Sequence, residues 1–211
     1  MGLKLRSDDG AVVGNVNYYN TQWKDRNQVK YVSSGSTDGA DAMVFLTGVN
    51  QNHSGFEVEG SAQLSSMFTL NGAVSYANWQ FDGDASGNYK EYTDTTTNVT
   101  DYVYALDGLY VGDSPQSQLV LGGTITPIDG LKIQGLYKFY DRNFADWSPG
   151  SREIGDDGDA DRAQVWEAPD YSRIDLHAYY DLPGSFSAGS TDITIQAFFH
   201  IFNLLDAIYV Q

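Results

Sequence analysis

The chain has 211 residues, of which 12 are Lys or Arg and 28 are Asp or Glu, so its formal net charge is −16. This acidic balance argues against nucleic acid as a partner, because nucleic-acid binding needs a basic surface. The absence of cysteine excludes disulfides and thiolate metal sites. No apolar run approaches the roughly 20 residues of a membrane-spanning helix, and the length suits one large all-β unit.

Long stretches of the chain alternate apolar and polar residues, which indicates β-strands with one apolar and one hydrated face. In chain order, the pattern predicts about eight strands, at residues 2–7, 11–24, 43–65, 67–81, 117–127, 131–143, 171–182 and 191–205. The connections are alternately short and long. Tight turns are expected at Ser7-Asp8-Asp9-Gly10, Ser65-Ser66 and Pro127-Ile128-Asp129-Gly130, and long loops at residues 25–41, 82–116 and 144–170.

This alternation of short and long connections between strands predicts an antiparallel up-and-down transmembrane β-barrel, with short turns on one side and long loops on the other. Several predicted strands are longer than the five or six residues that are usual in soluble proteins. Aromatic residues such as Trp23, Trp79 and Tyr180 gather near strand ends, as in the aromatic girdles of membrane barrels. A soluble β-sandwich alternates in the same way and remains an alternative. The membrane prediction requires the following residues to contact acyl chains: Phe56, Leu70, Ile133, Leu176 and Ile195.

Several short stretches resemble the C-terminal half of a TonB-dependent outer-membrane receptor. They are Gly55-Phe56-Glu57-Val58-Glu59, Gly112-Asp113-Ser114-Pro115-Gln116, Tyr140-Asp141-Arg142-Asn143-Phe144-Ala145-Asp146, and Phe202-Asn203-Leu204-Leu205-Asp206 followed by Tyr209. The resemblance implies a larger barrel of about 22 strands, of which residues 1–211 would supply about eight. It also implies two partners: a plug domain of the same full-length protein, and the TonB complex, which contacts a box before the plug.

The chain shows no signal sequence, TonB box, plug or final aromatic strand, so we expect a C-terminal fragment of the barrel. The resemblance implies a place in the cell outer membrane, in contact with its lipid. It further implies import of a scarce small-molecule solute, such as an iron-siderophore, a cobalamin or an oligosaccharide. Two other hypotheses stay open: a soluble β-sandwich that binds carbohydrate through Trp147 and Trp166, and a complete small outer-membrane barrel with a structural or adhesive role.

Charged residues on the polar faces of the predicted strands are candidates for the barrel lumen. They are Glu57, Glu59, Lys132, Lys138, Arg142, Arg173, Asp175 and His177. They would contact the plug, line the solute path, or form a hydrated wall of mixed charge. No nucleophile or base motif accompanies the pair Glu57 and Glu59, so enzyme activity is not expected, and no cofactor is implied.

The long loops carry candidates for ligand contact. Trp147, Trp166 and Tyr171 would stack on a sugar or an aromatic chelate, or alternatively pack within a folded loop. Two acidic segments are calcium candidates, with a solvated loop as the alternative; their residues are Asp82, Asp84 and Ser86 in one and Asp157, Asp159 and Asp161 in the other. The chain's three histidines lie far apart in sequence and show no metal-ligand spacing, so no other metal site is predicted.

Overall fold

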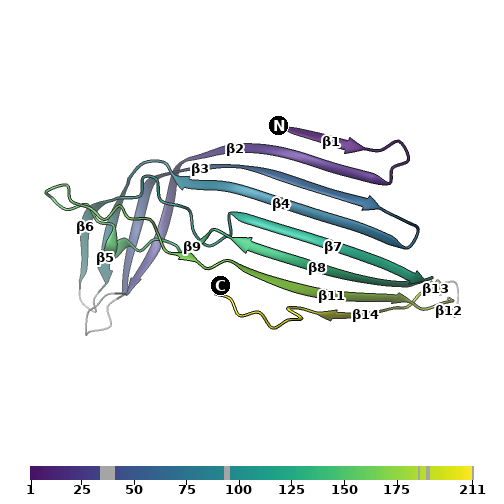
Figure 1. Cartoon of the computed structure of the whole chain (residues 1–211). Helices are drawn as coiled ribbons and strands as arrows, with labels where there is room; N and C mark the ends of the chain where they lie inside the picture. Colours follow the sequence, from purple (N-terminus) through teal and green to yellow (C-terminus); the bar gives the residue numbers. More distant parts are fainter. Residues whose placement is uncertain (34–40, 93–95, 185, 189–190, 211) are drawn as a thin grey trace.

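The computed structural model describes residues 1–33, 41–92, 96–184, 186–188 and 191–210 of the chain. Within these residues, ten strands form one antiparallel sheet (Figure 1). Its hydrogen-bonded path runs in the order β1 (Gly2–Arg6), β2 (Val12–Ser33), β3 (Asp41–Gln63), β4 (Phe68–Phe81), β7 (Ser117–Ile128), β8 (Leu131–Asp141), β11 (Tyr171–Asp181) and β14 (Gln196–Ile201). No helix among the described residues has the length and apolar character needed to cross a membrane.

The connections confirm the predicted alternation of short and long. Tight turns join β1 to β2, β3 to β4 and β7 to β8 at one end of the sheet, and the long connections from β4 to β7 and from β8 to β11 lie at the other end (Figure 1). Gly10 and Gly130 have φ angles of 70° and 82° in two of the tight turns, a backbone conformation that glycine adopts without strain. The turn chemistry therefore fixes which strands are neighbours.

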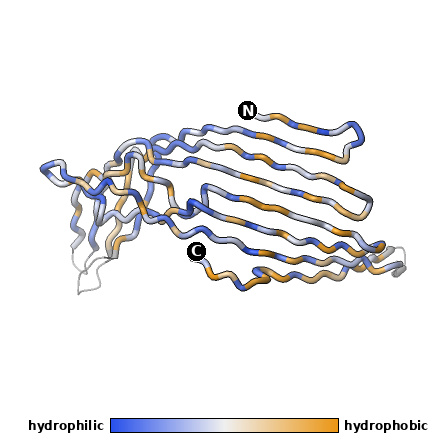
Figure 2. The backbone as a smooth tube through the Cα atoms, viewed as in Figure 1, coloured by the Kyte–Doolittle hydropathy of each residue, from blue (hydrophilic) through white to orange (hydrophobic). Residues whose placement is uncertain are grey.

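The strand register separates an apolar face from a polar face. Phe56 on β3 lies opposite Tyr18 on β2 and Tyr76 on β4, whereas its sequence neighbour Glu57 points to the other side because side chains alternate along a strand. Figure 2 shows this alternation along the long strands. The register places the side chains of four residues on the apolar face: Phe56, Leu70, Ile133 and Leu176.

This apolar face is open rather than packed against a second sheet. Phe56 is 55% exposed, and the other two sheets among the described residues have only two strands each. These sheets are β9 (Asn143–Phe144) with β10 (Glu167–Ala168), and β12 (Phe186–Ala188) with β13 (Thr191–Ile193). The soluble β-sandwich alternative is therefore wrong. The remaining residue of the lipid-facing set, Ile195, lies between β13 and β14 and is also exposed.

All three predicted long loops contain strand residues, and β10 lies in the third of them. β2 continues to Ser33, beyond the predicted end at residue 24, and its register against β3 shifts between Trp23 and Gln28. Asp25 and Gly48, which lie on either side of this irregularity, have φ angles of 52° and 69°. The rest of the predicted loop, residues 34–40, lies outside the described residues. Such bulges bend a strand pair and offset its alternation by one residue.

The stretch predicted as irregular between β4 and β7 contains a hairpin of β5 (Ala85–Tyr92) and β6 (Thr97–Tyr104), and β5 pairs with the first half of β3. The hairpin and residues 105–116 and 144–168 form a folded layer, here called the cap, at the loop end of the sheet (Figure 1). The cap packs against the loop ends of β3 and β4 around one shared apolar core. Its buried residues are Val44, Leu46, Val49, Phe81, Ala85, Tyr104, Leu106, Leu109, Phe144, Trp147 and Val165.

Candidate functional site

A stack of three aromatic side chains lines a hollow where the polar face of the sheet meets the cap. Trp23, His53 and Trp79 come from β2, β3 and β4, and their ring centroids lie 4.6 Å and 5.3 Å apart. The hollow has a volume of about 430 Å³. The guanidinium of Arg26 lies 4.3 Å from the ring centroid of Trp23, a cation–π contact. The hollow therefore offers aromatic surface beside a fixed positive charge.

Trp79 is held in place from two sides. Its indole Nε1 donates a hydrogen bond of 3.0 Å to the hydroxyl of Tyr19. Gly55, the residue opposite Tyr19, leaves room for that ring, since a Cβ at this position would lie 2.7 Å from the hydroxyl oxygen. The side chain of Gln116, which is 1% exposed, accepts from the backbone N–H of Trp79 at 2.9 Å and donates to its carbonyl at 3.1 Å. The side-chain amide of Gln116 thus pairs with the backbone of β4 in the way that the backbone of a neighbouring strand would.

A ridge formed by two loop segments bounds this hollow. Asp113 donates its backbone N–H to the carbonyl of Phe144 at 3.0 Å. Gly112 approaches the opposite segment so closely that a Cβ would lie 2.6 Å from the carbonyl carbon of Ala145. The Lys30 ammonium pairs with the carboxylate of Asp146. The ridge therefore carries two carboxylates, one of which is neutralised by a lysine.

A second hollow of about 410 Å³ lies on the other side of the ridge and shares Asp113 and Asp146 with the first. Trp166 and Tyr171 line it. The Tyr171 ring is stacked between Tyr140 and Tyr209, with centroid distances of 5.0 Å and 4.3 Å. We call the two hollows and the ridge between them the mouth.

The three aromatic loop candidates have separate positions. Tyr171 and Trp166 meet in the second hollow, and Trp166 is 58% exposed. Trp147 is 4% exposed and belongs to the core of the cap, so in this arrangement it packs a folded loop rather than facing a ligand. The sequence did not single out the stack in the first hollow or the role of Gln116. The one available signal was the place of Trp23 and Trp79 near strand ends.

Seven of the eight lumen candidates share the polar face: Glu57, Glu59, Lys132, Lys138, Arg173, Asp175 and His177. Three of them form an ion network. The Asp175 carboxylate is 0% exposed and lies 2.8 Å from the Lys138 ammonium and 3.8 Å from the Arg173 guanidinium. It also accepts the backbone N–H of Asn203 at 2.9 Å. Much of the charge on this part of the wall is therefore internally paired.

Arg142 differs from the prediction for this set. Its φ angle of 54° breaks the alternation at the end of β8. Its guanidinium lies 4.9 Å from the ring centroid of Tyr76, a residue of the apolar face, and donates to the carbonyl of Ala77 at 2.6 Å. Arg142 therefore ties β8 to β4 at the edge of the cap instead of facing the lumen.

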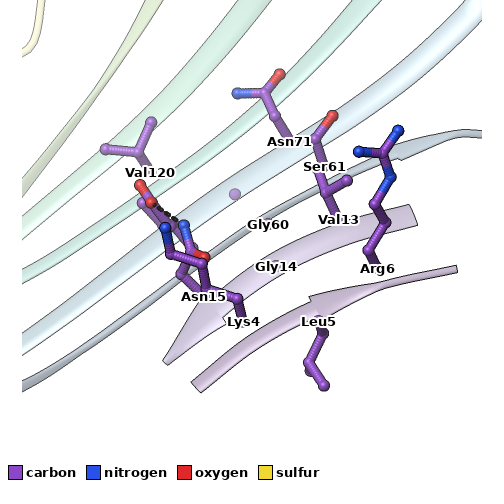
Figure 3. A pocket seen from close by; sticks show the side chains of 13 residues that line it. Lys4, Leu5, Arg6, Val13, Gly14, Asn15, Gly60, Ser61, Asn71 and Val120 are labelled. Carbon is purple, nitrogen blue, oxygen red and sulfur yellow. Dashed lines mark hydrogen bonds between the residues drawn. The ribbon is translucent and has the colours of Figure 1, made fainter. Parts of the chain in front are cut away.

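Near the turn end, the polar face of β1 to β4 contains a third hollow of about 490 Å³. Figure 3 shows Arg6 and Leu5 projecting to opposite sides of β1, with Asn15 and Asn71 among the lining side chains. Asn15 donates to the Glu59 carboxylate at 2.7 Å. The lining of this hollow is mixed, because Val13, Ala73 and Val120 stand beside the polar side chains.

The calcium candidates lie in the cap or, for Asp82 and Asp84, in the short connection that leads into it from β4. The Arg162 guanidinium donates two hydrogen bonds to the Asp84 carboxylate, at 3.1 Å and 2.8 Å. It also accepts the backbone N–H groups of Leu106 and Asp107. The hydrogen bond from Arg162 outweighs burial and holds the pKa of Asp84 below its usual value of 3.8, and the same pair raises the pKa of Arg162. Calcium binding through Asp84 remains a prediction that requires Arg162 to withdraw.

The second calcium segment borders a polar hollow of the cap. Asp157 and Asp159 line it together with Glu153, and Asp161 lies 3.6 Å from the Arg152 guanidinium. Over the described ranges, no three His, Cys, Asp or Glu residues are grouped so that they could hold a metal ion. Burial raises the pKa of the Tyr104 hydroxyl, and the nearby Glu153 carboxylate adds to this effect.

Comparison with known proteins identifies a family. A family model described as TonB dependent receptor-like, beta-barrel matches residues 1–204. No curated protein and no solved structure matches the chain significantly. Receptors of this family are outer-membrane proteins that transport solutes. The family match covers nearly the whole chain and agrees with the open antiparallel sheet, its two faces and its one-sided long loops, so the chain belongs to the TonB-dependent receptor-like β-barrel family.

Proposed function

We propose that this chain forms part of the wall of an outer-membrane receptor that captures a scarce solute at the mouth and imports it with energy from TonB. The observation that carries the proposal is the pair of aromatic hollows on either side of the ridge formed by Asp113 and Asp146. The ridge between them follows β9, which lies at the loop end of the sheet (Figure 1). Concave sites with aromatic walls and a few fixed polar groups are the usual form of small-molecule sites.

The charges of the mouth favour some of the candidate solutes over others. Lys30 is paired with Asp146, and Arg26 lies over an indole ring, so the described residues that line the mouth include no cluster of unpaired cations. The chain as a whole carries a net charge of −16. A strongly anionic iron chelate would therefore meet an unfavourable field. A cobalamin or a neutral oligosaccharide, with extended apolar surface and many hydrogen-bonding groups, suits this mouth better.

The fold suggests how capture leads to import. The solute would bind between the cap and the plug domain of the full-length receptor, and movement of the plug would open a path along the polar face. The paired charges of Lys138, Arg173 and Asp175 leave few free charges to hold the solute on this part of the wall. Weak binding along the path is what release into the periplasm requires.

The test uses the full-length receptor that carries this chain, with a ferric siderophore, cobalamin and a maltooligosaccharide as probes. The double variant Trp23→Ala/Trp79→Ala should weaken binding of the preferred solute by about tenfold or more, since aromatic anchors dominate binding energies. Tyr18→Ala, on the apolar face, is the matched control and should leave binding unchanged. Equal affinity in the double variant and the wild type would show that the mouth is not the binding site.

Uptake in cells tests the energy source separately. In cells without TonB, the proposal predicts that the receptor still binds the solute at the surface but does not accumulate it. Accumulation at the wild-type rate without TonB would contradict the proposed energisation. That result would not bear on whether the mouth binds the solute, which the previous experiment tests.

A further inference from the structure

The fold brings together two histidines that are 23 residues apart in the sequence. His177 on β11 lies directly opposite His200 on β14, and both side chains project from the polar face. Their Nδ1 atoms are 2.8 Å apart. This pair is separate from the mouth and has no part in the proposed capture of solute.

The separation of the two nitrogens suits the coordination sphere of one metal ion. Imidazole nitrogens bind first-row metals at about 2.0–2.1 Å. Two such ligands at adjacent corners of a square or an octahedron, at 90°, are therefore about 2.8–3.0 Å apart, whereas two ligands of a tetrahedron are about 3.3–3.4 Å apart. The 2.8 Å separation is that of a hydrogen bond between the two rings, and it also equals the first of these spacings, so an ion that replaces the shared proton needs little movement of either ring. This spacing fits Cu²⁺ and Ni²⁺, which favour square or tetragonal sites with nitrogen ligands.

Neighbouring aromatic rings fix the orientation of both imidazoles. The Phe202 ring lies edge-on to His177 with a centroid distance of 5.6 Å, and Tyr179 lies edge-on to His200 at 5.4 Å. His177 is 8% exposed. Side chains that are held by packing lose little freedom when they bind an ion, so the pair is preorganised.

The charges and donors around the pair are compatible with a divalent ion. Asp175, two residues along β11, is already paired with Lys138. Gln134 lies opposite His177 on β8 and donates its amide N–H to the Thr124 hydroxyl at 3.3 Å. The amide oxygen of Gln134 takes no part in that hydrogen bond and is a neutral group on the residue opposite His177. With only two protein nitrogens, the ion would keep open positions for water or another donor.

We propose that His177 and His200 form a two-histidine binding site for a late first-row divalent metal ion, Cu²⁺ or Ni²⁺, on the lumen face of the barrel wall. Because the polar face of such a barrel is hydrated, the ion would reach the pair from water. Cu²⁺ should bind more tightly than Ni²⁺, following the general order of affinities for nitrogen ligands.

The test is a Cu²⁺ titration of the untagged full-length receptor in detergent, followed by electron paramagnetic resonance. The wild type should bind the ion with a spectrum that shows coupling to two imidazole nitrogens. His177→Gln and His200→Gln should each weaken this binding by about tenfold or more, the equivalent of at least about 1.4 kcal/mol. His53→Gln, which removes the chain's third histidine, is the matched control and should bind Cu²⁺ as the wild type does.

A second measurement needs no variant and so does not depend on correct folding of one. Diethylpyrocarbonate modification of the wild-type receptor, mapped by mass spectrometry, should show that Cu²⁺ protects His177 and His200 together but not His53. The proposal is overturned if neither histidine is protected, or if the two-nitrogen signal survives in His177→Gln/His200→Gln. The two rings would then be joined only by a hydrogen bond.

Discussion

Replacement of Trp147 by alanine should open the cap while leaving the barrel wall folded. The Trp147 side chain is 4% exposed and lies edge-on to Phe81 and 5.8 Å from the ring of Tyr104, measured between centroids. The Lys30 ammonium nitrogen lies 4.3 Å from the centroid of the Trp147 ring. Replacing a buried Trp by Ala typically costs about 3–5 kcal/mol. Because this core lies at the loop end of the sheet, the cost should appear as local opening of the cap and of the strand ends packed against it.

The assay is hydrogen–deuterium exchange of the full-length receptor in detergent, followed peptide by peptide. A cost of about 3–5 kcal/mol corresponds to roughly two to three and a half decades of faster exchange in the cap. Trp166→Ala is the matched control, because Trp166 is 58% exposed and an exposed residue should change stability by no more than about 0.5 kcal/mol. Equal protection of the cap in both variants, or an equal loss of protection in the halves of β3 and β4 nearest the tight turn between them, would refute the reasoning.

Three further changes test other parts of the structure. Gly112→Ala should push the ridge apart, because its Cβ would lie 2.6 Å from backbone atoms, and we expect a loss of about 1–3 kcal/mol in cap stability by the same exchange assay. Lys138→Met leaves the buried Asp175 carboxylate without its partner at 2.8 Å. It should lower the free energy of unfolding in urea by about 1.5–3 kcal/mol, and an unchanged midpoint would contradict the ion network. The depressed pKa of Asp84 stabilises the cap above the ordinary value of 3.8. That contribution should disappear as the pH falls through the lower folded-state pKa. Proteolysis of the cap should show this acid sensitivity in the wild type, and Arg162→Gln should shift it to higher pH.

The division of the strands into two faces follows from the sequence. Along the segment from Phe56 to Glu59, apolar and acidic residues alternate with a period of two, and the short turns fix which strands are adjacent. A one-residue slip would place every apolar side chain on the wrong face, so the pattern and the register determine each other. The prediction that Phe56 shares its face with Leu70 is confirmed for this reason.

The sequence did not predict two kinds of segment. In one kind the alternation is interrupted, and in the other the strands do not face lipid and so need not alternate. The bulge near Asp25 shifts the period by one residue, which hid the second half of β2. The β5–β6 hairpin stands in the cap, where no lipid-facing side requires apolar residues. Arg142 leaves the expected face because of its positive φ angle.

The sequence also could not predict contacts between segments that are far apart in the chain. His177 and His200 meet only because β11 and β14 pair in one particular register, and sequence spacing does not contain that information. For the same reason the sequence could not distinguish the buried Trp147 from the exposed Trp166, since a loop without periodicity gives no indication of which side chain points inward.

The central claim, that the apolar face contacts lipid while the polar face is wet, can be measured directly on β3. The chain contains no native cysteine, so once any cysteine in the rest of the receptor has been replaced, single cysteines at positions 56, 57, 58 and 59 of the reconstituted receptor can each carry one spin label. We predict that labels at 56 and 58 collide mainly with oxygen dissolved in the bilayer, and labels at 57 and 59 mainly with a water-soluble nickel chelate. Uniform accessibility of all four positions, or the reverse alternation, would contradict the account.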